Sequence, residues 1–205
     1  MLHLIDDFYP DPDEVRHRAL KLDYIDGQKK GKKINHPGAR AFNPWYSNMI
    51  YLRNRWETIT GKKAVKFQYG WSNGAFNLGY KRKHLFNWVH GDHTKDIEGD
   101  YMYWAAVIYL TPEPPYGTGT VLLEHKRTKV IRQYENDAPT VGESFEEFAS
   151  SKAEANWRPH ITIENRYNRC VIYDGTLFHA PRLSSFGHNK ETGRLTQLGF
   201  WQSEW

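Results

Sequence analysis

A succession of short β-type segments constrains the fold of this chain more than any other feature. From about residue 63 onward, eight runs rich in β-branched and aromatic residues are separated by turn residues, with only brief helical stretches between them. The runs span residues 63–71, 74–80, 84–90, 101–110, 117–125, 159–165, 169–175 and 194–202. Many short strands with frequent turns are typical of antiparallel sandwiches and jelly rolls. We therefore expect a mainly β fold with flanking helices.

Two helices are predicted before these strands. Asp11 and Pro12 form a helix start, in which the aspartate caps the first turn and the proline takes the first helical position. A second helix should end at Gly61, because apolar residues repeat at helical spacing before it, namely Trp45, Met49, Leu52, Trp56 and Ile59. With 205 residues, we expect one domain over 1–205, in which helices within 11–60 pack on a β core formed by 63–205.

The composition indicates a folded protein in a reducing compartment. Aromatic residues make up 15% of the chain, which argues against disorder. The formal net charge of +4 comes partly from a Lys-rich stretch at 27–40, which we expect to be a solvated loop. Cys170 is the single cysteine, so no internal disulfide can form. No apolar run is long enough to span a membrane and the first residues lack a signal-peptide pattern, so we expect a soluble, cytoplasmic protein.

A histidine and an aspartate two positions apart, His90 and Asp92, are the first residues that suggest chemistry. Side chains alternate along a strand, so both would point into the same space. The pair is either half of a metal site or a polar strand end. The strongest candidate for a third ligand among the ten histidines is His179, at the end of a β-type run that should be buried. His93 would face the opposite way on a continuing strand.

The last predicted strand carries a candidate anion-binding pair. Arg194 and Thr196 alternate onto one face of it, and a guanidinium with an adjacent hydroxyl is well suited to hold a carboxylate. Two histidines and one carboxylate on one side of a ferrous ion leave three coordination positions open, which suits oxygen chemistry. A chelating 2-oxo acid would fill two of these positions, with its far carboxylate on Arg194. Dioxygen would take the third.

The order of His-x-Asp, a distal histidine and an arginine on the final strand resembles the iron(II)/2-oxoglutarate-dependent oxygenase superfamily, most closely its prolyl-hydroxylase-like branch. The likeness covers about residues 74–202. It implies a double-stranded β-helix, and a reaction in which 2-oxoglutarate and dioxygen give succinate and carbon dioxide while a substrate C–H bond is hydroxylated. The site residues that it implies are the iron(II) ligands His90, Asp92 and His179, and the 2-oxoglutarate contacts Arg194, Thr196, Tyr109 and Tyr80.

The substrate and one long segment are less constrained. The resemblance favours an amino-acid or peptidyl side chain as substrate, and the mild positive charge makes a nucleobase the second candidate. Residues 126–158 separate two predicted strands and contain a capped helix from Ser144 to about Ala155. We expect this segment to be either a substrate lid or a surface excursion. This long insertion after Glu124, and a Gly-Thr-Gly-Thr turn where a double glycine is commoner, depart from the family pattern.

Two rival functions are left open by the residues alone. A zinc hydrolase would use the same three ligands with an activated water, but it gives no role to Arg194 and Thr196. A non-enzymatic jelly-roll module that binds nucleic acid would use the basic stretch and the aromatic residues, but it needs no metal-type ligands. Turnover that requires iron and 2-oxoglutarate, retention of zinc, or neither would distinguish the three. The oligomeric state is not indicated by any pattern.

Overall fold

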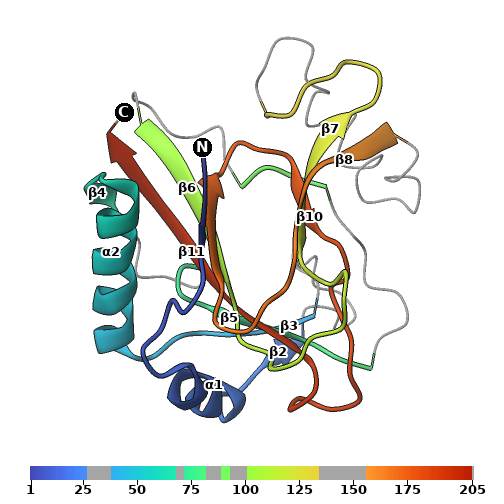
Figure 1. Cartoon of the computed structure of the whole chain (residues 1–205). Coiled ribbons are helices and arrows are strands. Elements are labelled where there is room, and N and C mark those ends of the chain that lie inside the picture. Colours follow the sequence, from blue (N-terminus) through green and yellow to red (C-terminus); the bar gives the residue numbers. More distant parts are fainter. Residues whose placement is uncertain (27–37, 68–71, 82–88, 93–100, 134–155, 205) are drawn as a thin grey trace.

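The structure is a computed structural model of the 205-residue chain, and it describes residues 1–26, 38–67, 72–81, 89–92, 101–133 and 156–204. Two helices and two antiparallel sheets make up these ranges (Figure 1). Neither of the described helices is long and apolar enough to cross a membrane. Residues 84–88 of the expected β run at 84–90, and the expected helix at 144–155, lie outside the described residues.

The larger sheet has eight strands, and β11 lies near its centre. Its order along the sheet is β1 (Leu2–Ile5), β9 (Cys170–Asp174), β6 (Tyr101–Tyr109), β11 (Arg194–Glu204), β5 (Phe76–Gly79), β3 (Ala39–Ala41) and β2 (Ile25–Asp26), and β4 (Ala64–Lys66) also pairs with β11. The smaller sheet has the order β10 (His179–Pro181), β7 (Thr120–His125) and β8 (Trp157–Ile163). All strand pairs are antiparallel.

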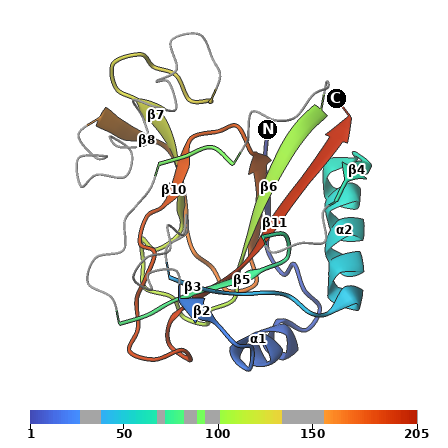
Figure 2. The same ribbon diagram turned by 180° about the vertical axis from the view of Figure 1, so that it is seen from behind.

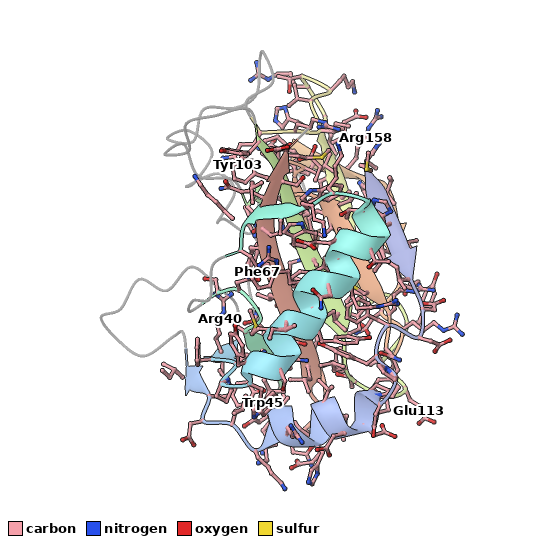
Figure 3. All side chains as sticks on the ribbon, turned by 90° about the vertical axis from the view of Figure 1, so that its left-hand side faces the viewer. Arg40, Trp45, Phe67, Tyr103, Glu113 and Arg158 are labelled. Atoms are coloured by element: carbon pink, nitrogen blue, oxygen red, sulfur yellow. The ribbon has the colours of Figure 1, made fainter. Side chains whose placement is uncertain are left out.

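The molecule is layered, with helices outside the larger sheet and the smaller sheet on its other side. Helix α2 (Tyr46–Thr60) runs along the outer face of the larger sheet, and α1 (Pro12–Leu20) lies near one end of it (Figures 1 and 2). Figure 3 looks directly onto α2, with the strands behind it. Two facing antiparallel sheets with flanking helices confirm the expected jelly-roll class.

Side-chain alternation divides the core into two layers. Alternate residues of β6, β9 and β11 pack against the helices, including Trp104, Ile108, Ile172, Leu195 and Trp201. The intervening residues face the smaller sheet, including Val107, Tyr109, Val171 and Tyr173, and they meet Leu122, Ile163 and Leu177 there. The inner layer therefore lies between the two sheets, where a jelly roll can hold a site.

Both helix boundaries agree with the expected signals. The Asp11 side chain accepts a hydrogen bond from the Glu14 backbone N–H at 2.9 Å, and Pro12 begins α1. Gly61 ends α2 in the left-handed conformation, with φ at 68°, and its N–H donates to the Glu57 carbonyl. The aspartate cap and the glycine stop are thus confirmed.

The N-terminal part contributes more than helices. β1, β2 and β3 all come from the first 41 residues and join the larger sheet. Residues 39 and 40, which we expected to belong to a solvated loop, form part of β3 and pair with β5. The expectation of a loop was wrong there, because pairing with β5 and burial of Arg40 outweigh the local Gly- and Lys-rich composition.

Candidate metal centre

The segment that carries His90 and Asp92 is fixed to the end of β10 by backbone hydrogen bonds. His90 and His179 form an antiparallel bridge, with N–H to carbonyl distances of 3.0 and 2.9 Å in the two directions. The Asp92 N–H donates to the Gly175 carbonyl at 2.7 Å. Residues distant in sequence are therefore held side by side, and their side chains share one space.

The three side chains converge as the sequence predicted. The two carboxylate oxygens of Asp92 lie 3.6 Å from His90 Nε2 and 3.3 Å from His179 Nε2. One ligand atom from each residue lies within 4.8 Å of the others, and no other group of this kind occurs in the described ranges. His179 is buried, Asp92 is partly buried and His90 is exposed, so the group is closed on one side and accessible on the other.

The protonation of His179 suits a metal ligand. Its Nδ1 lies 2.9 Å from the Leu177 carbonyl, and since a carbonyl can only accept, Nδ1 carries the hydrogen. Burial lowers the pKa of His179 to about 4, although the Asp92 carboxylate opposes this shift. Near neutral pH, Nε2 therefore presents a lone pair towards the Asp92 carboxylate. Two acceptors that face each other at this distance form a pocket for a cation.

The inner face of the larger sheet presents a row of polar residues across four neighbouring strands. Tyr109 pairs with Thr196, Thr196 pairs with Asn77, and Asn77 pairs with Arg40. Directly paired residues point to the same side of a sheet, so all four face the smaller sheet. Arg194 lies two residues from Thr196 and shares this face.

Arg194 is a buried cation within this row. Its guanidinium lies 3.4 Å from the Thr196 hydroxyl and 3.5 Å from the Thr118 carbonyl, and 5.9 Å above the ring of Tyr109. Burial lowers its pKa, and no carboxylate of the described residues forms an ion pair with it. The Tyr109 hydroxyl donates to Thr120 Oγ1 at 2.7 Å, which fixes the ring below the guanidinium. The arrangement is suited to an anionic group from outside the chain.

Tyr80 is the expected site residue that the structure does not bring to this face. Tyr80 follows β5 at the same strand alternation as Phe76 and Leu78. It therefore packs with them in the core on the side of the sheet that the helices cover. His93 lies outside the described residues. His125 is buried, with its ring 5.0 Å from that of Trp157 and its Nδ1 2.8 Å from the Thr128 hydroxyl oxygen.

Two residues near the centre were missed in the sequence. Tyr173 is buried on the inner face, with its ring 4.9 Å from that of His179, and the charges of both Asp92 and Arg194 act on its hydroxyl. Strand alternation before Gly175 could have identified it. Arg40 donates from Nε to Asn77 Oδ1 at 2.8 Å and lies close enough to Asp92 to sense its charge. No sequence signal separated this arginine from the basic stretch before it.

Solved structures with the same fold include metal- and 2-oxoglutarate-dependent enzymes. HygX from Streptomyces hygroscopicus, with nickel, 2-oxoglutarate and hygromycin B bound, is 13% identical, with a TM-score of 0.56 over 99% of this chain and 82% of HygX. A prolyl hydroxylase from Trichoplax adhaerens, in complex with a peptide of the hypoxia inducible factor, is 14% identical, with a TM-score of 0.51 over 99% of this chain and 83% of the other.

A third neighbour shows that enzymes of this fold differ in their reactions. SnoN, a non-heme alpha-ketoglutarate-dependent epimerase from nogalamycin biosynthesis, is 10% identical, with a TM-score of 0.53 over 99% of this chain and 78% of SnoN. At these identities the likeness establishes the fold. No curated protein matches the chain in sequence.

One family model does match, and it covers the candidate centre. It aligns with residues 85–201, which is more than half of the chain and includes His90, Asp92, His179 and Arg194. The chain therefore belongs to DUF6445, a family of unknown function.

Proposed function

We propose that this protein is an iron(II)- and 2-oxoglutarate-dependent oxygenase. The observation that carries the proposal is the pairing of a His-Asp-His group with a buried arginine on the sheet that faces it. His90, Asp92 and His179 would hold iron through two imidazole nitrogens and one carboxylate. This donor set on one side of the metal is typical of ferrous oxygenases.

The buried cation at Arg194 supports 2-oxoglutarate as the co-substrate. Burying a guanidinium away from water without an anionic partner costs roughly several kcal/mol of folding free energy. An incoming carboxylate would offset that cost. The planar fork of Arg194 and the hydroxyl of Thr196 would bind the far carboxylate of a five-carbon diacid. Tyr109 would support the guanidinium from below through its ring.

The side chains of the candidate centre have distinct parts in this scheme. Iron held by His90, Asp92 and His179 would supply the activation of dioxygen that couples conversion of 2-oxoglutarate to succinate and carbon dioxide with oxidation of a substrate. His179 keeps its hydrogen on Nδ1 through the Leu177 carbonyl and so presents Nε2 as a ligand. Tyr173, beside His179, and Tyr109, beneath Arg194, are both buried and would help to keep the site dry. The exposed side of His90 leaves a path for substrate.

The proposal also concerns the class of substrate. The neighbours HygX and the Trichoplax prolyl hydroxylase hold hygromycin B and a peptide respectively. We infer a small molecule or peptide as substrate, with an amino-acid or peptidyl side chain as the first choice. Because SnoN is an epimerase on the same fold, hydroxylation is proposed here from the resemblance of the motifs rather than from the fold.

Anaerobic titration of the protein with iron(II) and then 2-oxoglutarate tests the proposal, followed by succinate analysis after oxygen is admitted. We expect one iron and one 2-oxoglutarate per chain. In Asp92→Ala, two imidazoles alone should hold iron poorly, so iron-dependent succinate formation should fall to background while the melting temperature stays near that of the parent. Asp23→Ala, at an exposed position on the described surface, is the matched control and should retain activity.

The rival functions predict different results in the same experiment. Tight zinc retention with hydrolase activity and without 2-oxoglutarate binding would favour the zinc enzyme. Nucleic-acid binding that Asp92→Ala leaves intact, with no metal bound, would favour the binding module. Full succinate formation in Asp92→Ala would refute the proposed ligand set.

A further inference from the structure

A second buried arginine lies on the same inner face as Arg194. Arg40 is only 8% exposed, and its place in β3 puts it at the end of the polar row that runs through Asn77 to Thr196. It is labelled in Figure 3. Burial lowers the pKa of Arg40 to about 10, and the nearby Asp92 carboxylate opposes the shift, so the side chain stays a cation at neutral pH.

The hydrogen-bonding capacity of this cation is mostly unused. Its Nε donates to Asn77 Oδ1 at 2.8 Å, and this is its one hydrogen bond to the described residues. Asp92 acts on Arg40 through its charge but is not within ion-pair distance of it. A guanidinium has five N–H donors, so both terminal nitrogens are left to bind another group.

Asn77 adds donors to the same position. Its Oδ1 accepts from Arg40 Nε, so the amide is held beside the guanidinium and its two Nδ2 hydrogens are additional donors. The guanidinium and the amide together present several N–H groups, and the acceptor oxygen of Asn77 already accepts from Arg40. Such a set is selective for an oxyanion over a cation or a neutral donor.

Arg40 is separate from the arginine that would hold the co-substrate. β3 and β11 are separated by β5, and neighbouring strands lie about 4.8 Å apart, so Arg40 and Thr196 are about 10 Å apart at the backbone. The two guanidinium groups are held by different strands, Arg40 by Asn77 of β5 and Arg194 by Thr196 of β11, so each is assigned its own anion. Arg40 lies close to Asp92 of the triad, where a substrate must come to react.

We propose that Arg40 and Asn77 form a second anion site, which binds an oxyanion of the substrate, a carboxylate or a phosphate, beside the metal centre. This inference rests on the proposed oxygenase function for the role of the anion as substrate. It specifies the substrate class as an acidic molecule and makes Arg40 a specificity-determining residue. The charge pairing would also orient the substrate towards the triad.

Anion titration of the metal-free protein tests the site without any turnover. Acetate and inorganic phosphate are added at constant ionic strength, with chloride as the reference, while the arginine Nε–H signals are followed by NMR. Arg40→Lys and Arg194→Lys assign the two buried arginines. We expect a saturable shift of the Arg40 signal with acetate or phosphate that chloride does not produce.

Asn77→Asp is the sharpest variant, because it keeps Arg40 and the fold and supplies an internal carboxylate in place of the external anion. We expect the affinity of Arg40 for acetate and phosphate to fall at least tenfold in this variant, roughly the loss of one charge-assisted contact. Arg53→Gln, on the outer side in α2, removes the same charge away from the site and should leave both titrations unchanged.

The outcomes separate this inference from the proposed function. An Arg40 signal that responds to neither anion would overturn the second site, whatever the enzyme does. A tenfold loss of 2-oxoglutarate affinity in Asn77→Asp and in Arg40→Lys would also overturn it, because Arg40 would then belong to the co-substrate. If the parent protein binds no iron or 2-oxoglutarate, the oxygenase proposal fails, while the anion titration still decides whether Arg40 binds an oxyanion.

Discussion

At Arg194, the shape of the guanidinium matters as much as its charge. It lies over the Tyr109 ring and beside the Thr196 hydroxyl, so the ring and the hydroxyl together position it. Arg194→Lys keeps the charge but loses the planar fork and the stacking. We expect the apparent 2-oxoglutarate affinity to weaken about tenfold or more, since a charge-assisted hydrogen bond contributes about 1.5–3 kcal/mol. Iron binding should stay near normal, which calorimetry with each ligand in turn would measure.

Thr118, whose backbone carbonyl contacts Arg194, provides a control for this prediction. Its side chain donates to the Pro115 carbonyl and not to Arg194, so Thr118→Ser should retain 2-oxoglutarate affinity. If Arg194→Lys binds 2-oxoglutarate as tightly as the parent, a different residue holds the far carboxylate.

Single-residue reasoning succeeded where strand alternation applied. Arg194 and Thr196 are an i and i+2 pair on β11 and share a face because the period of a strand is two. His90 and Asp92 also converge, but only His90 is in a β-bridge, and Asp92 lies in a bend held by its backbone bond to Gly175. Tyr80 was named from the family resemblance, which does not determine the face on which its side chain lies. Its phase with Leu78 takes it to the helix side.

At the scale of elements, α2 is held to the sheet by a close fit at one glycine. Trp56 stacks on Trp201 with ring centroids 4.5 Å apart, and its ring edge lies over Gly199 of β11. A Cβ at position 199 would lie 2.2 Å from Cη2 of Trp56. Gly199→Ala should therefore destabilise the protein by about 1–3 kcal/mol, the usual range for overpacking a core. Thermal or denaturant unfolding would measure the loss.

Gly175→Ala is the matched control for this change. A Cβ there would meet its nearest neighbour at 3.5 Å, which is an ordinary contact. Combining Gly199→Ala with Trp56→Phe should cost less than the sum of the single changes, because the smaller ring relieves the clash. Strict additivity would show that the glycine is needed for another reason.

Element prediction was strongest where the signals were local. The Asp11 cap, the Gly61 stop and the buried stripe of α2 follow from hydrogen bonding and helical spacing within a few residues. β3 was missed because it is three residues long and follows a lysine-rich stretch. Neither the alternation of its side chains nor its composition indicated a strand. Its pairing with β5 is a long-range contact that local sequence does not encode.

At the scale of the whole molecule, the jelly-roll class was predictable and the arrangement of its strands was not. Short β runs and frequent turns indicated two facing antiparallel sheets. The order β1-β9-β6-β11-β5-β3-β2 depends on which strands pair across the chain, and the composition of each strand leaves that choice open. This order places the β3 cation opposite the triad, which is why Arg40 emerged only from the structure.

The same long-range pairing makes ligand binding a property of the whole fold. The triad joins residues 90–92 to β10, and Arg194 is on β11, so the unfolded chain has no assembled site. Iron and 2-oxoglutarate should therefore stabilise the native state only. At a ligand concentration one hundred times Kd, the gain is about 2.7 kcal/mol, which for a chain of this size raises Tm by about 5–10 °C.

Thermal unfolding under anaerobic conditions measures this coupling. We expect 2-oxoglutarate to raise Tm when iron(II), or a redox-inert substitute such as manganese(II), is present, and to raise it far less without metal, because chelation needs the ion. Asp92→Ala should lose the metal-dependent part of the shift. Arg194→Lys should keep the shift caused by metal alone and lose most of the further shift caused by 2-oxoglutarate. Stabilisation by zinc that 2-oxoglutarate does not increase would contradict the oxygenase assignment, because it would leave the buried cation on β11 without a partner from the proposed reaction.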